Sequence, residues 1–278
     1  MKKLTKEQRE NYLKAKILIY DIEISPTLGW TYGQYETNVL RVEKEPILMS
    51  FSYKWLGDTA KATCETLSYV EAQAWDDRRL VKKLRDLFDE ANLICGHNSD
   101  RFDNKVVTGK FIDYGLTPPS PYKTWDTLKM ARKSAKFGSN KLDSLGKRFG
   151  EGAKTAITQG DIWHDFLFGN KATHHKVEKL LIKYNNQDVD LDEAVFWHLL
   201  PYHQSGITLG RLINNPWVCD CGCSEGQFHG CGFDPVGKYR RWQCNACGKW
   251  SKVYEMEKEV RDEVNPKEER PQLRHIAG

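Results

Sequence analysis

The chain has 278 residues and a formal net charge of +4, and 40% of its residues are hydrophobic, 29% charged and 12% aromatic. This composition is typical of a globular protein and excludes a largely disordered chain, and no stretch approaches the roughly 20 consecutive apolar residues of a membrane-spanning helix. The length predicts one full-sized domain with a small second one, and a basic N-terminal segment that no apolar run follows predicts a cytoplasmic protein.

The first predicted element is a strand over residues 16–24, KILIYDIEI. Apolar side chains recur on both of its faces, so we expect it at the centre of a sheet. Three more strand-like runs follow, and their short polar or glycine-containing connections predict an antiparallel meander with the first strand. These runs are GWTYGQYE (29–36), PILMSFSYKWL (46–56) and AKATCETLS (60–68).

The pattern changes to alternating helices and strands after residue 70. Apolar residues at helical spacing predict a helix over 71–91, and NLICGHN (92–98) is typical of a short buried strand. The next helix is expected to begin near Asp100, which can cap its N-terminus, and to end at Gly115. Further helices are predicted over 121–137, 141–150 and a long stripe from about 174 to 200.

Two changes of composition mark the domain boundaries. INNPW at 213–217 separates the α/β region from a cysteine-rich segment, and a polar, charge-mixed stretch begins after Tyr254. This last stretch has no apolar pattern, so we expect it to be a disordered tail. The predicted parts are an α/β domain over 1–212, a small domain over 213–254 and the tail over 255–278.

Two carboxylates on the first strand require an explanation. Residues two apart on a strand point to the same face, so Asp21 and Glu23 can approach one site together. Such a pair is either an ordinary one at a solvent-exposed strand end, or a buried one that needs basic partners or a hard divalent cation. Two further acids favour the cation. Asp103 lies where a predicted strand gives way to a helix, and Asp188 lies on the apolar stripe of the late helix, one turn after Tyr184.

These residues form three motifs that, in this order, resemble the exonuclease motifs of the DEDD superfamily. The likeness covers about residues 14–205 and is to the tyrosine-bearing branch, which includes the proofreading domains of family B DNA polymerases and stand-alone exonucleases, many of them bacterial or viral. WDTLKMARKSAKFGSNKLDSLGKRFG also resembles the stretch between their second and third motifs. The motifs are D-x-E (Asp21, Glu23), H-N-x-x-x-F-D (His97, Asn98, Phe102, Asp103) and Y-x-x-x-D (Tyr184, Asp188).

The resemblance implies a ribonuclease H-like fold, with a mixed central sheet flanked by helices, and removal of mononucleotides from a 3′ end with two Mg²⁺ or Mn²⁺ ions. It assigns Asp21, Glu23 and Asp188 to one ion, and Asp21 with Asp103 to the second. Tyr184 would orient the attacking water. We expect single-stranded DNA 3′ ends as substrate, in preference to RNA. The remaining motif residues, His97, Asn98 and Phe102, are candidate contacts to the terminal nucleotide, although the first two can equally satisfy the strand end.

Six of the eight cysteines crowd into residues 219–247. In a reducing compartment such clustering favours a metal over disulfides. Cys244 and Cys247 form C-x-x-C followed by Gly248, typical of one half of a zinc ribbon, whereas the upstream half has no C-x-x-C. For one structural Zn²⁺ the preferred ligands are Cys219, Cys223, Cys244 and Cys247, with Cys221 as a competitor and Cys231 or His229 as further alternatives.

Two cation-rich stretches suggest a nucleic-acid partner. Ten Lys and Arg against three acids lie between Lys105 and Arg148, a stripe that can neutralise phosphates or can be a solvated helix face. In GKYRRWQCNACGKWSK (237–252) cations alternate with aromatic rings, which suits unpaired bases, although a small domain also needs aromatics for its core. The candidate contacts here are Arg240, Arg241, Trp242 and Trp250.

Two rival functions stay open at this point. The chain can be a nucleic-acid-binding or assembly module whose nuclease fold has lost activity, although the presence of all the motif acids argues against it. It can also be a structure-specific endonuclease on the same fold, which would cut circular single strands as an exonuclease cannot.

Overall fold

The computed structural model describes residues 4–33, 35, 38–152, 159–203 and 207–254, and no helix within them is long and apolar enough to cross a membrane. The chain divides into two compact units, Met1–Ile207 and Thr208–Gly278. The predicted tail, 255–278, lies outside the described residues.

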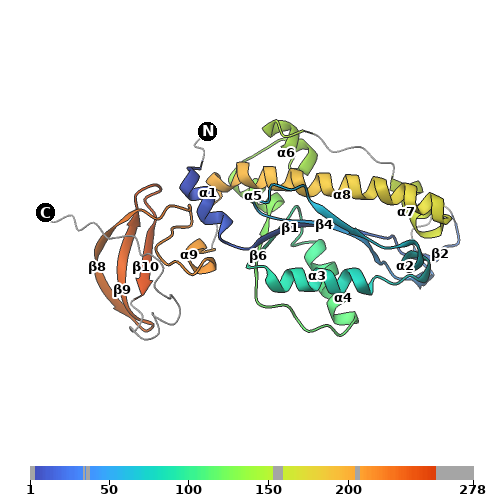
Figure 1. Cartoon of the computed structure of the whole chain (residues 1–278), viewed down its shortest axis with the longest axis horizontal. Helices are drawn as coiled ribbons and strands as arrows, with labels where there is room; N and C mark the ends of the chain where they lie inside the picture. The colour runs from blue at the N-terminus through green and yellow to red at the C-terminus, as the bar shows by residue number, and fades with distance from the viewer. Residues whose placement is uncertain (1–3, 34, 36–37, 153–158, 204–206, 255–278) are drawn as a thin grey trace. The chain divides into compact units, whose positions relative to one another are not determined.

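The first unit is built on a five-stranded mixed sheet with the strand order β5-β4-β1-β6-β7 (Figure 1). The acid-bearing strand β1 is central, as its two apolar faces predict. It pairs antiparallel with β4, which pairs antiparallel with β5, and on its other side it pairs parallel with β6, which pairs parallel with β7. The strands are β1 (Ile17–Ile24), β4 (Leu48–Trp55), β5 (Thr63–Thr66), β6 (Leu93–Gly96) and β7 (Lys123–Asp126).

Helices flank both faces of this sheet. In Figure 1 the long helix α8 lies above β1 and β4, whereas α3 and α4 lie below them. Within the described residues the helices of this unit are α1 (Lys6–Leu13), α2 (Tyr69–Ala74), α3 (Arg78–Glu90), α4 (Asp103–Asp113), α5 (Thr127–Ser134), α6 (Leu142–Phe149), α7 (Gln159–Phe168), α8 (Lys171–Leu199) and the 3₁₀ turn η1 (Leu200–Tyr202).

The sheet face toward α3 and α4 is apolar. Tyr20 of β1 packs edge-on against Phe88 of α3 at a ring-centroid distance of 5.1 Å, and its hydroxyl donates to Asn104 at 2.6 Å. Leu84 and Phe88 are fully buried in the same cluster, which also includes Phe111 of α4. Because each fully buried large apolar side chain contributes about 1.5–3 kcal/mol, this face is the main stabilising core of the unit.

The face toward α8 is polar in its central part. Cross-strand pairing aligns Asp21 of β1 with Ser52 of β4 and Cys64 of β5, and it aligns Glu23 with Ser50 and Thr66 in the next row. Residues paired in this way share a face of the sheet. Both acids of β1 therefore point toward α8, in rows of polar side chains.

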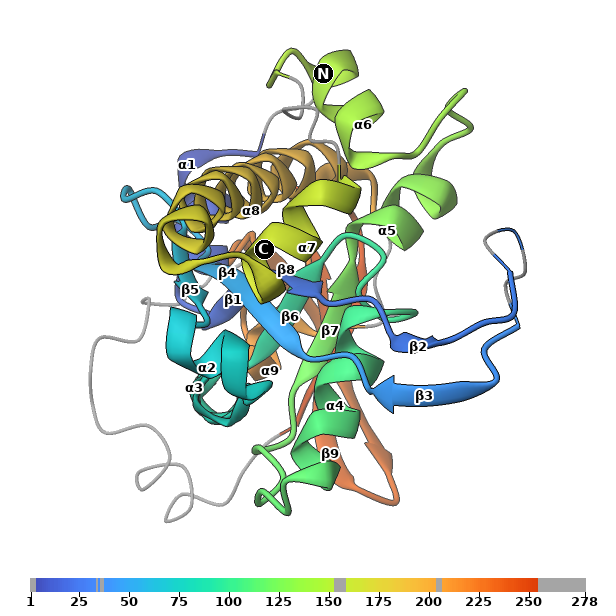
Figure 2. The same cartoon turned by 90° about the vertical axis from the view of Figure 1, so that its right-hand side faces the viewer.

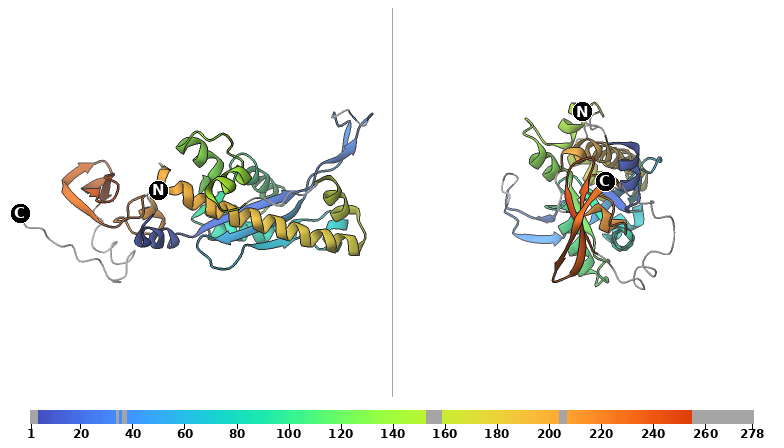
Figure 3. Two further views of the ribbon diagram at one scale, coloured as in Figure 1. Left: turned by 90° about the horizontal axis from the view of Figure 1, so that it is seen from above. Right: turned by 90° about the vertical axis from the view of Figure 1, so that its left-hand side faces the viewer.

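Strands β2 (Leu28–Trp30) and β3 (Arg41–Lys44) pair only with each other, so the predicted meander is wrong for GWTYGQYE; β1, β4 and β5 alone form it. Figures 2 and 3 show these two strands as an arm extending away from the central sheet. The side chains of Trp30, Tyr32 and Tyr35 are 64%, 85% and 93% exposed. We call this segment, residues 28–44, the β2–β3 arm.

The predicted helix over 71–91 is two helices in the structure. Trp75 ends α2 in the left-handed region at φ 58°, and α3 starts at Arg78. Between them Asp77 is fully buried, accepts a hydrogen bond from the Leu48 backbone at 2.7 Å and pairs with Lys110 at 3.1 Å. These tertiary contacts on Asp77 outweigh the local helical pattern, which does not report them.

Two predicted helix starts are also wrong. Asp100 does not cap α4, because its carboxylate accepts from Asn104 at 3.0 Å and pairs with Lys129 at 2.8 Å, and α4 begins at Asp103. The start of the predicted helix over 121–137 is strand β7, and α5 begins at Thr127 with Asp126 as its N-cap.

The second unit is a three-stranded antiparallel sheet with the order β10-β9-β8, preceded by a short helix. Trp242 is 2% exposed and packs with Val253 and three of the cysteines in the core. Gly226 faces this ring so closely that a Cβ atom would lie 2.2 Å from it, which explains the glycine. The elements are α9 (Leu209–Leu212), β8 (Gly226–Asp234), β9 (Gly237–Cys244) and β10 (Trp250–Tyr254).

Candidate functional site

The acids of β1 face a polar stretch of α8. Ser52, aligned with Asp21, donates a hydrogen bond to Asn186 of α8 at 2.8 Å. Ser50, aligned with Glu23, accepts one from Asn185 at 3.3 Å. Ser50, Ser52 and Asn185 are fully buried, so this helix–sheet contact is hydrogen-bonded where an ordinary one is apolar.

Tyr184 and Asp188 lie on the same part of α8. Asp188 is 2% exposed, and the half-buried Tyr184 hydrogen-bonds to it. Burial raises the pKa of Tyr184 above its usual range, and the negative charges of Asp188, Glu23 and Asp21 raise it further. Those three carboxylates thus lie close enough to the phenol to oppose its ionisation.

Asp103 is the first residue of α4, and its side chain reaches the backbone of β1. It is 5% exposed, and its carboxylate is hydrogen-bonded by its own backbone N–H and by that of Ile22, the residue between Asp21 and Glu23. Burial raises the pKa of Asp103 to about 6, and the negative charge of Asp126 also raises it. The two hydrogen bonds act in the opposite direction and lower it.

The end of β6 makes room for this approach. The pairing of β6 with β1 stops at Cys95 and Ile19, so the last residues of β1 extend past their parallel neighbour. A Cβ atom on Gly96 would lie 2.9 Å from the Tyr20 carbonyl oxygen, too close for any larger residue without a shift. Asn98 then turns the chain at φ 67°, a conformation that asparagine tolerates better than most residues.

The other second-motif residues contact the β7–α5 junction. The ring of His97 lies 2.9 Å from the Thr127 hydroxyl, which in turn donates to Asp192 of α8 at 2.5 Å. The backbone N–H of Asn98 donates to Asp126 at 3.0 Å. Phe102 is 44% exposed and occupies the N-cap position of α4. His97 and Asn98 therefore satisfy the strand end, one of their two predicted roles, and the nucleotide-contact role stays a prediction.

The predicted carboxylates share one region of the fold without forming a tight cluster. Among the residues that the structure describes, the cysteines below are the one group of three or more His, Cys, Asp or Glu side chains whose ligand atoms all lie within 4.8 Å of one another.

Several buried polar residues of this region were missed by sequence reasoning: Ser50, Ser52, Asp126 and Asn185 are each at most 3% exposed. One signal was present. In LMSFSYKW two serines alternate with Met49 and Phe51, the pattern of a strand with one apolar and one polar face.

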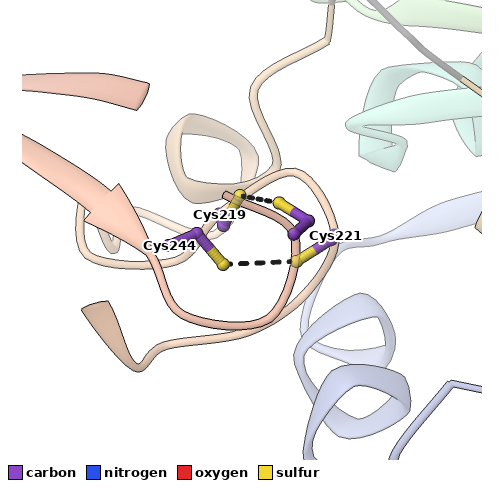
Figure 4. Close-up of side chains that lie close together, drawn as sticks. Cys219, Cys221 and Cys244 are labelled. Atoms are coloured by element: carbon purple, nitrogen blue, oxygen red, sulfur yellow. Dashed lines mark hydrogen bonds between the residues drawn. The ribbon is translucent and has the colours of Figure 1, made fainter. Parts of the chain in front are cut away.

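The cysteines of the second unit form a group that can hold a metal ion such as zinc. Its members are Cys219, Cys221, Cys244 and Cys247. The Sγ atoms of Cys219 and Cys247 lie 3.6 Å apart. Those of Cys221 and Cys244 are also 3.6 Å apart, and Figure 4 shows this pair. A tetrahedral zinc with Zn–S bonds of about 2.3 Å requires S–S distances of about 3.8 Å, which these two distances approach.

The preferred upstream ligand Cys223 needs correction, because Cys221 takes its place in the group. The Cys223 sulfur accepts a hydrogen bond from the Glu225 backbone at 3.4 Å. Glycines at positive φ follow both Cys221 and Cys247, Gly222 at 85° and Gly248 at 73°. The two halves of the site thus end in the same kind of turn, and the glycine after Cys221, which matches the one after Cys247, was the overlooked signal.

The candidate nucleic-acid contacts of the second unit lie on two different faces of its sheet. Trp242 is a core residue, so the prediction that it contacts nucleic acid is wrong. It has the alternative role given above for the aromatics, packing a small core. Arg240 shares its face and lies over the Phe228 ring at 5.9 Å. Strand pairing places Arg241 opposite Lys252 on the other face, next to Trp250, which is 52% exposed.

Compared with known proteins, the chain matches no protein-family model and no curated protein sequence. A functional assignment therefore depends on the motifs and on the geometry described above.

Proposed function

We propose that the chain is a metal-dependent 3′-to-5′ exonuclease of the tyrosine-bearing DEDD type, on a ribonuclease H-like fold. The observation that carries the proposal is the electrostatic contact of three distant motif residues: the charges of Asp21, Glu23 and Asp188 all act on the Tyr184 phenol. Asp103 supports it, because its carboxylate is bound by the β1 backbone between the first two acids.

The donor set fits hard divalent cations. All the motif acids offer oxygen, the ligand atom that Mg²⁺ and Mn²⁺ prefer, and two of them, Asp103 and Asp188, are almost fully buried. Buried carboxylates so placed are stabilised by a cation. Asp21, Glu23 and Asp188 would hold one ion, and Asp21 with Asp103 the second.

Bound ions would supply charge stabilisation for the phosphodiester and an activated water. The chain's own residues do the rest. The Tyr184 hydroxyl, held by Asp188 and kept protonated by its raised pKa, can donate or accept a hydrogen bond and so orient water. The Ile22 N–H fixes the Asp103 carboxylate, and the Ser and Asn side chains between β4 and α8 fix the helix against the sheet.

Single-stranded nucleic acid is the proposed partner, and DNA the preferred one. The β2–β3 arm follows the acid-bearing strand directly and exposes three aromatic rings, which are surfaces on which unpaired bases stack. On the zinc-ribbon unit, Arg241, Lys252 and Trp250 offer a second surface of the same chemistry.

A nuclease assay with strand-polarity readout tests the proposal. The zinc-loaded protein is incubated with Mg²⁺ or Mn²⁺ and 5′-labelled single- or double-stranded DNA or RNA, beside a circular single strand. We expect a ladder that shortens one nucleotide at a time from the 3′ end, no cutting of the circle, and no activity when Mg²⁺ and Mn²⁺ are omitted.

Matched variants link the activity to the site. Asp21→Asn and Asp188→Asn should each lower kcat by about 10³-fold, since a lost cation removes several kcal/mol of transition-state stabilisation. Asp113→Asn, which neutralises an exposed acid at the end of α4, is the control and should keep full activity. Binding without turnover in the wild type would favour the non-catalytic module, and a cut circle would favour the endonuclease.

A further inference from the structure

A basic pocket lies at the C-terminal end of α5, away from the motif acids. It has a volume of about 380 Å³, and Arg132, Lys133 and Lys136 line it together with Ser134, Phe137 and Asn140. No carboxylate is among its lining residues. In the part of the chain that the structure describes, neither Arg132 nor Lys136 forms an ion pair, so the pocket carries uncompensated positive charge.

Two buried polar atoms point to a ligand in this pocket. The Ser134 hydroxyl oxygen and the Asn140 side-chain oxygen are inaccessible to solvent and have no hydrogen-bond partner among the described residues. Buried polar groups are rarely left in this state, because their desolvation costs free energy that a partner must offset. The Ser134 hydroxyl can donate a hydrogen bond, and so can the NH₂ group of Asn140 once its amide is rotated by 180°. Beside cationic side chains, such donors are suited to an anion.

The helix α5 connects this pocket to the candidate active site. Its first residue, Thr127, contacts His97 and Asp192, and Asp192 lies one helical turn after Asp188 on α8. Ser134 ends the helix seven residues later, which is about 10 Å along its axis. At the rise of about 3.4 Å per nucleotide in a stacked strand, the length of α5 from Thr127 to Ser134 corresponds to two or three nucleotides.

We infer that the pocket binds a backbone phosphate of the substrate strand, two to three nucleotides from the reacting 3′ end. This inference rests on the proposed nuclease function and names a contact that the motifs do not include. Arg132 and Lys136 supply the charge, and Ser134 and Asn140 supply hydrogen bonds to the phosphate oxygens. The site contacts the phosphate backbone and not the bases, so its affinity for a strand does not depend on the nucleotide sequence.

The test compares Arg132→Gln/Lys136→Gln with the control Lys6→Gln/Lys82→Gln, which removes the same charge from exposed positions on α1 and α3. Binding of 5′-fluorescein-labelled dT12 to the zinc-loaded protein is followed by fluorescence anisotropy at 50–300 mM NaCl, without Mg²⁺ or Mn²⁺. We expect the pocket variant to raise Kd about tenfold more than the control. The slope of log Kd against log salt should fall by about 0.7, the value for one phosphate of a single strand.

Strand length separates the pocket from the active site. In the series dT2 to dT12 the loss of affinity should appear only once the strand is long enough to reach the pocket. Turnover of the p-nitrophenyl ester of thymidine 5′-phosphate, which is too short to reach it, should stay within twofold of the wild type. An equal loss on this ester and on dT12, or the wild-type Kd and salt slope in the pocket variant, overturns the inference.

Two further outcomes are distinguishable. If the wild type hydrolyses nothing, the proposed function fails, but the anisotropy comparison still decides whether the pocket binds a strand. Titration of inorganic phosphate and of thymidine 5′-phosphate tests free anions as the ligand. Micromolar binding of either one that the pocket variant loses would make the pocket a site for free phosphate or nucleotide, and the strand assignment would be wrong.

Discussion

The choice of zinc ligands gives the sharpest prediction, because two cysteines two residues apart are expected to behave differently. Cys221 belongs to the group whose sulfurs lie within 4.8 Å of one another, and Cys223 does not. Cys221→Ser should therefore weaken zinc binding strongly, and Cys223→Ser should leave one equivalent of zinc in place. Cys231→Ser, at an exposed position, is the control for loss of a thiol as such.

The size of the effect follows from the site's geometry. The paired sulfurs at 3.6 Å are close to the edge length of about 3.8 Å in a tetrahedral zinc site, and each of the four cysteines belongs to one such pair. Structural zinc binds with an apparent free energy of about 10–16 kcal/mol, and one of four equivalent ligands accounts for roughly 2.5–4 kcal/mol. At about 1.4 kcal/mol per factor of ten, Cys221→Ser should lower zinc affinity by 10²–10³-fold.

Competition with a chromophoric zinc chelator measures this affinity, and elemental analysis after gel filtration measures the stoichiometry. Loss of zinc by Cys223→Ser with retention by Cys221→Ser would refute the geometric assignment. The double variant Cys221→Ser/Cys223→Ser tests whether Cys223 replaces Cys221 as a zinc ligand. If Cys221→Ser keeps its zinc and only the double variant loses it, the reason for excluding Cys223 is wrong.

Three further predictions concern the first unit. Tyr184→Phe should lower kcat by about 10²-fold, less than Asp188→Asn, because water orientation is lost while the cation ligands remain; single-turnover kinetics on 5′-labelled DNA check this, and an equal loss in both variants would contradict the role of the phenol. Asp103→Asn, without Mg²⁺ or Mn²⁺, should stabilise the fold by about 3 kcal/mol at pH 8 and by little at pH 4. The pKa of Asp103 is raised to about 6 in the folded state, so the wild type loses stability as the pH rises from about 4 through 6. Urea unfolding at both pH values measures the difference, and a pH-independent difference would show that ionisation is not the cause. Trp30→Ala should weaken dT12 binding by about 1–3 kcal/mol without changing the unfolding midpoint, because the ring is 64% exposed; fluorescence anisotropy decides it, and an unchanged Kd would remove this ring of the arm from the partner surface.

The sequence alone determined the features that depend on local periodicity. Apolar residues on both faces of β1 required a central strand, and the structure has it at the centre of the sheet. The apolar stripe predicted α8 and its end near Pro201. The C-x-x-C turn identified half of the cysteine group, because its spacing is set by the few residues that surround one metal ion.

Only the tertiary structure decided which distant residues meet. The aromatic run GWTYGQYE has a strand pattern whether it joins the central sheet or forms the β2–β3 arm, and pairing partners are not encoded in a period of two. Cys221 and Cys223 have the same alternation, so only the fold of the turn around Gly222 distinguishes them. The buried layer of Ser50, Ser52 and Asn185 combines side chains from two separate segments, β4 and α8. Local pattern fixes which face of an element is apolar, whereas the packing of the whole chain fixes what each polar side chain touches.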